Sequence, residues 1–311
     1  MLWLTKGLVE LGHRVYIGAR RGSRLPDGAV LLPFDPAESS ARDLLKKIPR
    51  DIDVVHFMAP PEEGVIEMLE CAALLTVHGN GKKGEIFPLN TVFLSRDHAE
   101  RHGASVFVYN GIDPAEYIFN PNSETRDHLL FLSKTTWSVK NLRGAISVCS
   151  RAKRKLIIAG GERPVSLRAK SLFIPGAKWI GSVAGRTKAE LIANAQALIF
   201  PIIWPEPFGL VIAEALMSGT PVLASPRGSV PELLTPQVGA IIEDHKWVEV
   251  LRNRDSVWKP EDCRARAMQL FHYRKMAESY ERLYHQLKDG KKLHDKNPVG
   301  QGFVVEKWRS I

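Results

Sequence analysis

Glu206 and Glu214 are the residues whose types and spacing best suit chemistry, because they bracket a proline-rich turn and the start of a helix. The apolar run 197–200 predicts a strand before the turn. A helix is expected from about 209 to 218, since glycine is favoured just past a helix end. Glu206 then precedes the helix N-terminus, and Glu214 lies about one and a half turns beyond that N-terminus.

The predicted helix start, at Phe208, Gly209 and Leu210, offers free backbone N–H groups and the positive end of the helix dipole. Phosphate oxygens bind favourably at such a place. With a diphosphate there, one carboxylate can reach a sugar and the other a ribose. Alternatively, the two glutamates are surface carboxylates of an ordinary α/β unit.

The elements that must position these residues are short apolar strands alternating with helical segments, which is the pattern of parallel α/β sheets. Strands are expected near 15–19, 30–32, 54–57, 74–78, 92–95 and 106–109 in the first half, and near 129–132, 156–159, 178–180, 198–200, 222–224 and 240–242 in the second. An amphipathic helix is expected over 2–11, and a long one over 265–288.

The Glu-x7-Glu spacing resembles the signature of family-four retaining glycosyltransferases. The flanking Pro-Glu-Pro-Phe-Gly, Glu-Ala-Leu-Met-Ser-Gly-Thr-Pro-Val and Gly-Ser-Val-Pro-Glu-Leu runs are similar to family usage, and the resemblance covers about residues 2–288. It implies a GT-B fold, in which two Rossmann-like α/β domains face each other across a cleft. Its domains would be an acceptor-side domain, 1–113, joined by the helix 265–288, a nucleotide-sugar-binding domain, 114–264, and an irregular tail, 289–311.

The family begins with a strand and a glycine-rich loop, whereas this sequence starts within the helix that follows them. The N-terminal domain is therefore expected to lack its central first strand. Three arrangements are open. The neighbouring strands close up, the segment 302–306 or another chain fills the gap, or an upstream extension supplies the strand.

The resemblance also implies donor-binding residues. Lys134 and Lys140 would grip the diphosphate, with Lys134 in place of the family's arginine. Gly160 and Gly161 would let the backbone approach the nucleotide, and Val183 would meet the base. Read without the resemblance, Lys134 is equally an exposed loop lysine, and the glycines mark a tight turn.

The resemblance further implies three residues that act on the reacting groups: Glu206 at the sugar, Lys140 at the departing diphosphate, and His78 near the sugar and acceptor. Glu214 would bind the ribose. His78 ends a predicted strand, where a histidine can also serve only as a hydrogen-bonded turn residue.

The expected reaction is hexosyl transfer from a nucleotide sugar to an acceptor hydroxyl, with retention of anomeric configuration. Lysines and a helix dipole supply the positive charge, so neither a metal site nor a cofactor is expected. A UDP-sugar is the first choice of donor and a GDP-sugar the second, and the acceptor is a sugar, a lipid-linked glycan or a small molecule. The alternatives are a nucleotide-sugar epimerase of the same fold and a degenerate, non-catalytic subunit.

Composition and charge limit the classes of molecule that the protein is expected to bind. The chain has 311 residues, a formal charge of +9 and a pI of about 9.5, which suits anionic ligands. Its basic runs lack interleaved aromatics, so nucleic acid is not expected, whereas peripheral contact with an acidic membrane surface stays open. Three widely spaced cysteines and a start broken by Lys6 and Glu10 predict a cytoplasmic protein without a signal peptide, membrane-associated at most at the cytoplasmic face.

Overall fold

The computed structural model describes residues 1–35, 37–122, 126–163, 176–253, 258–305 and 307–308. The chain divides into two compact units. Unit 1 comprises 1–112 and 271–302, and unit 2 comprises 113–270 and 303–311. Each unit has its own parallel β-structure and its own hydrophobic core.

Unit 2 is built on one six-stranded parallel sheet with the order β11-β10-β9-β6-β7-β8. Numbered along the chain, this is the 3-2-1-4-5-6 order of a Rossmann-type sheet, and it reverses between β6 and β9. The strands are β6 (Leu129–Leu132), β7 (Leu156–Ala159), β8 (Ala177–Gly181), β9 (Ala197–Phe200), β10 (Val222–Ala224) and β11 (Gly239–Ile241). Ligands of such sheets bind at the carboxyl ends of the strands beside the reversal.

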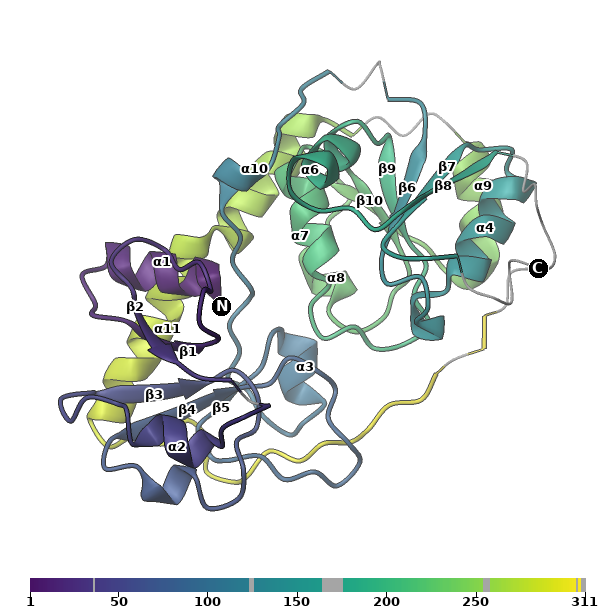
Figure 1. Cartoon of the computed structure of the whole chain (residues 1–311). Helices are drawn as coiled ribbons and strands as arrows, with labels where there is room; N and C mark the ends of the chain where they lie inside the picture. The colour runs from purple at the N-terminus through teal and green to yellow at the C-terminus, as the bar shows by residue number, and fades with distance from the viewer. Residues whose placement is uncertain (36, 123–125, 164–175, 254–257, 306, 309–311) are drawn as a thin grey trace. The chain divides into compact units, whose positions relative to one another are not determined.

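Helices cover both faces of this sheet (Figure 1). On one face α4 and α9 pack with the inward side chains of the strands in a core that includes Phe131, Val148 and the fully buried Trp247. On the other face lie α6 and α7. The unit 2 helices are η2 (Pro114–Glu116), η3 (Ser138–Lys140), α4 (Leu142–Arg151), α6 (Gly185–Ala193), α7 (Leu210–Met217), α8 (Val230–Leu233), η4 (Asp244–Lys246), α9 (Trp247–Arg252) and α10 (Pro260–Phe271).

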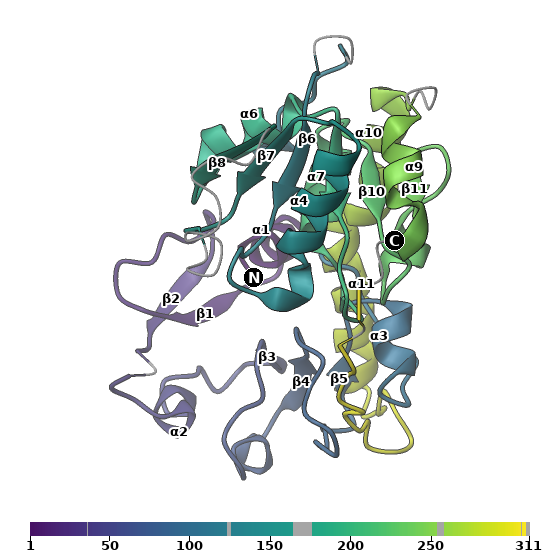
Figure 2. The ribbon, with the colours of Figure 1, turned by 90° about the vertical axis from the view of Figure 1, so that its right-hand side faces the viewer.

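Unit 1 carries two separate parallel sheets, β1-β2 and β3-β4-β5 (Figure 2). Its core forms where α1 and α11 pack together and onto β4, through Leu8, Leu74 and Tyr280 among others. The elements are α1 (Leu2–Glu10), β1 (Tyr16–Ala19), β2 (Val30–Pro33), α2 (Ala41–Leu45), β3 (Val54–Phe57), η1 (Ile66–Met68), β4 (Ala72–Thr76), β5 (Thr91–Val92), α3 (Arg96–Glu100) and α11 (Tyr273–Lys288).

The expected vacancy in the unit 1 sheet is present among the described residues, since β1 and β3 are not paired with each other. Neither do the described residues 302–305 form a strand. Among the described residues, neither closure by the neighbouring strands nor a strand formed by the tail is therefore seen, and filling by another chain stays a prediction. The expected strand over 106–109 was also wrong, because only a single bridge, from Phe93 to Phe107, forms there.

The single helix predicted over 265–288 was wrong as well, because α10 and α11 are separated at His272. His272 has an extended backbone (φ −67°, ψ 131°), and its ring accepts a hydrogen bond from the N–H of Arg274. The backbone of Ile112 forms hydrogen bonds with the two residues that flank His272. Its N–H donates to Phe271 O (2.7 Å), and its carbonyl accepts from Tyr273 N (3.1 Å). These bonds to Ile112 replace the backbone hydrogen bonds that a continuous helix would form. The periodicity of the apolar residues could not predict them.

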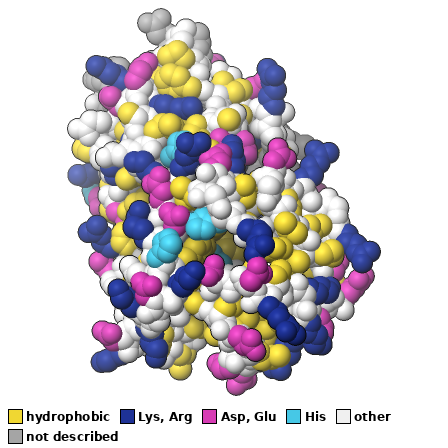
Figure 3. Space-filling view, turned by 90° about the vertical axis from the view of Figure 1, so that its left-hand side faces the viewer, with side chains coloured by type: hydrophobic (Ala, Val, Ile, Leu, Met, Phe, Trp, Pro, Cys, Tyr) yellow, Lys and Arg dark blue, Asp and Glu magenta, His cyan; other side chains and the backbone are white. Residues whose placement is uncertain are grey.

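The excess positive charge is not gathered on the face drawn in Figure 3, where described Lys and Arg side chains are interspersed with Asp and Glu. A mixed surface of this kind binds a uniformly anionic partner less strongly than a single-sign patch does. Among the described helices, none has the length and apolar character needed to cross a bilayer.

Candidate functional site

The candidate site in unit 2 lies where the strand order reverses. β6 leads at its carboxyl end into the loop that carries Lys134 and Lys140, and β9 leads into the turn that carries Glu206. Because adjacent parallel strands end at the same edge of a sheet, two segments 66 residues apart in sequence meet there.

Lys140 and Glu206 form a buried ion pair at this edge. Lys140 Nζ lies 2.5 Å from Glu206 Oε2, and the two side chains are only 11% and 9% exposed. The same oxygen accepts a hydrogen bond from the indole N–H of Trp204 at 2.7 Å. The Lys140 ammonium also lies over the rings of Trp204 and Phe200, 4.9 and 5.4 Å from their centroids. Sequence reasoning did not assign a role to Trp204, although it stands two residues before Glu206.

Asn141 fixes the loop that presents Lys140. Its backbone is left-handed (φ 56°), and its side chain caps α4 by accepting from Gly144 N (3.1 Å). The side-chain amide donates to Pro201 O (2.9 Å), which ties this loop to the end of β9. Asparagine is one of the few residues other than glycine that tolerates this conformation, and here it adds two side-chain hydrogen bonds.

Gly228 and Ser229 hold the turn that carries Glu206. Ser229 donates from its N–H to Glu206 O (2.9 Å) and from its hydroxyl to Phe208 O (2.8 Å). Gly228 has φ 60°, and a Cβ there would lie 2.2 Å from Glu206 N. Only glycine permits this approach, so the backbone under Glu206 is set by a loop more than twenty residues later.

Arg227 adds a second brace. Its guanidinium binds both carboxylate oxygens of Asp244, at 3.0 and 2.8 Å, and donates to Ile202 O at 3.0 Å. The planar fork of arginine suits this paired contact, and the side chain is nearly buried. The carboxyl end of β9 is therefore held rigidly.

The helix after the turn begins as predicted. Gly209 is its N-cap with a left-handed backbone (φ 82°), and the first helical residue is Leu210. Ile212 N–H donates to Gly209 O (2.8 Å), whereas Gly209 has no side chain that could cap the N–H groups of Leu210 and Val211. Phe208 is buried beneath the turn, whereas Leu210 is 38% exposed. This end of α7 can accept an anion.

Glu214 is buried in α7 at 3% exposure. Its Oε1 is 2.6 Å from Lys188 Nζ on α6 and accepts from the Tyr117 hydroxyl at 3.0 Å. Burial, and then the neighbouring carboxylate, raise the pKa of Tyr117 well above its usual value, so the phenol stays protonated and donates. Neither partner was expected from the sequence.

The remaining unit 2 residues lie on the loops after β6, β7 and β8. Gly160 approaches the first of these loops closely, since a Cβ would lie 2.2 Å from Ser133 O, and Gly161 has φ 141°. Lys134 is exposed, with its ammonium 4.9 Å from the centroid of the Trp137 ring. Val183 is half-buried just after β8. All nine expected donor-binding residues, together with Glu206, are thus in unit 2.

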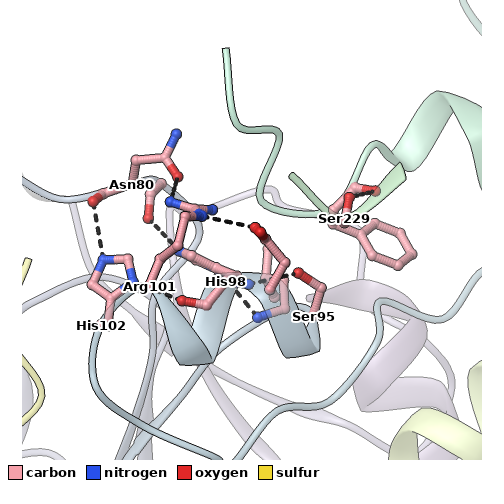
Figure 4. A network of polar contacts seen from close by, with 10 residues as sticks. Asn80, Ser95, His98, Arg101, His102 and Ser229 are labelled. Carbon is pink, nitrogen blue, oxygen red and sulfur yellow. Dashed lines mark hydrogen bonds and ion pairs between the residues drawn. The ribbon is translucent and has the colours of Figure 1, made fainter. Parts of the chain in front are cut away.

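His78 lies in unit 1, exposed at the carboxyl end of β4. Side chains of α3, and of the two residues that follow α3, form hydrogen bonds with the residues after His78 (Figure 4). His98 meets Gly79 O at 2.8 Å, His102 meets Asn80 O at 3.0 Å, and Arg101 donates to Asn80 Oδ1 at 2.8 Å. This network fixes the loop that begins at His78.

His98 must be neutral for this network to hold. Its Nδ1 accepts from Leu94 N (3.3 Å), which leaves the proton on Nε2 for the carbonyl of Gly79. Burial, with smaller contributions from His102 and Arg101, lowers the pKa of His98 to about 3. An unfolded chain would instead take up this proton near pH 6.5.

We therefore expect stability to fall as the pH drops below about 6.5, because the unfolded state then binds the proton that folded His98 excludes. The contribution of this group approaches 1.4 kcal/mol per pH unit. Denaturant melts between pH 7.5 and 5 should show a shallower dependence for His98→Gln than for the wild type. The matched control is His285→Gln, at an exposed position of α11. Equal slopes for all three proteins would contradict this assignment.

Two aspartates in unit 1, Asp51 and Asp53, form the sequence Asp-x-Asp, a spacing that often binds metal ions. They precede β3, at the amino end of the strand, and pair with Arg14 and with Lys288 (2.7 Å). Both are solvent-exposed salt bridges away from the carboxyl ends of the strands. No group of three or more potential metal ligands occurs among the residues that the structure describes.

Comparison with known proteins agrees with this architecture. The glycosyltransferase AviGT4, involved in avilamycin A biosynthesis, is similar over 93% of this chain and 88% of its own, with a TM-score of 0.73 and 24% identity. HepE from Anabaena, solved in complex with UDP, matches over 83% and 86%, with a TM-score of 0.63 and 15% identity. At these identities the likeness establishes the fold, which is that of the GT-B glycosyltransferases.

The sequence matches go further. The family model for glycosyl transferases group 1 matches residues 114–268, which include the Lys140–Glu206 pair and Glu214. An uncharacterized glycosyltransferase of Methanocaldococcus jannaschii is 28% identical over 170 residues, covering 48% of this chain and 42% of that relative. Residues 114–268 therefore form a unit of the glycosyl transferases group 1 family.

Proposed function

We propose that this protein is a retaining, metal-independent glycosyltransferase that transfers a hexose from a nucleotide sugar to an acceptor hydroxyl. The observation that carries the proposal is the Lys140–Glu206 pair, held at the reversal point of the sheet in the turn that leads into α7. A cation, an anion-binding helix end and a sugar-binding carboxylate are what donor recognition requires.

In the proposed reaction, the bond between the anomeric carbon and the phosphate oxygen breaks, and its electron pair leaves with the nucleoside diphosphate. The acceptor oxygen bonds to the same face of the sugar, and its proton passes to the departing phosphate. Lys140, Lys134 and the N–H groups at the start of α7 stabilise the charge that develops on the diphosphate. Glu206 holds sugar hydroxyls, and His78 would lie near the sugar and acceptor.

Glu214 fits the ribose, because its Oε2 has no partner among the described residues, while Lys188 and Tyr117 hold Oε1. A carboxylate oxygen fixed in this way can accept hydrogen bonds from a ribose diol. Gly160, Gly161 and Val183 would lie along the nucleoside. A UDP-sugar is the preferred donor, a choice supported by the presence of UDP in the HepE structure.

The proposal is tested by thermal unfolding in the presence of UDP-, GDP-, ADP- and dTDP-sugars. A donor present at 100 times its Kd should add about 2.7 kcal/mol to the free energy of unfolding. The expected result is stabilisation by one base family, reduced in Lys140→Met. Absence of stabilisation by every donor would overturn the proposal and favour a non-catalytic subunit.

Glu206→Ala and Glu214→Ala are expected to differ in their kinetic effects. Loss of Glu214 should mainly raise the donor KM, because a ribose contact serves ground and transition states alike. Loss of Glu206 should also lower kcat, since its partner is the reacting sugar. Both are measured in one assay, as release of nucleoside diphosphate from the donor that the thermal screen selects. The reverse pattern would show that the two roles are exchanged.

EDTA should leave turnover unchanged, because lysines and a helix N-terminus supply the positive charge that a metal supplies in other transferases. The measurement compares diphosphate release before and after chelation, with magnesium and manganese added back to the chelated sample. Loss of turnover in EDTA with recovery on adding metal would refute metal independence.

A further inference from the structure

Glu206 is held by two donors that converge on one oxygen. Lys140 Nζ and Trp204 Nε1 lie 2.5 and 2.7 Å from Oε2. No partner of Oε1 is found in the described part of the chain. The carboxylate therefore presents one free oxygen, and the other oxygen is oriented by an ammonium and an indole.

The two donors differ in mobility. Lys140 has a flexible four-carbon stem and is drawn to phosphate as a point charge. Trp204 has two rotatable side-chain bonds, and its ring is in edge contact with Trp137 and Phe303, at centroid distances of 6.3 and 5.3 Å. A diphosphate at the start of α7 would compete with Glu206 for Lys140, whereas the packed indole of Trp204 cannot turn away from Glu206 as readily as a lysine side chain can.

We propose that Trp204 is a positioning residue, which keeps Glu206 oriented toward the sugar when Lys140 turns from the carboxylate to the diphosphate. This inference rests on the proposed function. It assigns to the indole N–H the hydrogen bond that persists through the reaction, whereas Lys140 exchanges its contact with Glu206 for one with the diphosphate.

The test removes the N–H and keeps the ring. Trp204→Phe should lower kcat about 10- to 100-fold, the effect of losing one hydrogen bond to a charged group. The donor KM should change less than about threefold, because the phosphate contacts remain. Trp204→His, which restores a ring N–H, should recover part of kcat. The matched control, Trp137→Phe, alters the neighbouring indole of the cluster and should stay within about twofold of the wild type.

A merely structural role for Trp204 would lower the melting temperature and the active fraction, leaving kcat per active site unchanged and Trp204→His without recovery. That result, or equal kcat for Trp204→Phe and Trp137→Phe, would overturn the inference. Calorimetric titration with UDP separates this outcome from failure of the proposed function. If the wild type binds no nucleotide and releases none from a donor, both proposals fail. If it does both, only the role of Trp204 is in question.

Discussion

Replacing Lys140 by methionine is expected to lower donor turnover about 10²–10³-fold, because the ammonium stabilises charge that develops as the diphosphate departs. The structure adds a second effect. The pair with Glu206 is buried, so the variant leaves a carboxylate without its counter-charge and should lose about 3–5 kcal/mol of folding free energy. Diphosphate release and denaturant melts measure the two effects.

The double variant Lys140→Met with Glu206→Gln separates stability from catalysis. Its neutral side chains no longer leave an unpaired buried charge, so most of the lost stability should return while turnover stays low. If the double variant recovered turnover along with stability, Lys140 would be a structural residue. If Lys140→Met kept normal turnover, the phosphate assignment would fail.

Gly228→Ala is expected to have the next largest effect, because a Cβ there would overlap the backbone of Glu206, 2.2 Å from its N and 2.4 Å from its O. The left-handed backbone costs about 1–2 kcal/mol for alanine, and overpacking about 1–3 more. We expect a loss of about 2–5 kcal/mol in folding free energy and a lower kcat, since the turn under Glu206 must shift.

The control is Gly290→Ala in unit 1, where φ is 75° and no atom lies within 4 Å of the added Cβ. It isolates backbone strain and should cost only about 1–2 kcal/mol, with normal turnover. Equal stability and equal kcat for the two variants would show that the loop of Gly228 does not position Glu206.

Much of the unit 2 site was predictable because its signals are local. The helix that follows Glu206 begins and ends where glycine and the apolar run predicted, at Leu210 and Met217. The strands on either side of the reversal are short apolar runs bounded by turn residues, and they formed as expected at Leu129–Leu132 and Ala197–Phe200.

The contacts that orient the side chains were not predictable, since they join residues far apart in sequence. Lys140 meets Glu206 across 66 positions, and Tyr117 meets Glu214 across 97. The break at His272 likewise depends on backbone bonds to Ile112. Propensity and periodicity describe only neighbours along the chain, so tertiary hydrogen bonds of this kind override them without a local signal.

Transfer with retention is tested most directly by the configuration of the sugar that leaves the donor. An α-linked nucleotide sugar is incubated with the enzyme, water or a hydroxyl compound acts as acceptor, and proton NMR records the anomeric signal before mutarotation. The account predicts release of nucleoside diphosphate together with an α-configured product, and about 10²–10³-fold slower release of both with Lys140→Met. A β-configured first product, or no diphosphate release from any nucleotide sugar, would contradict it.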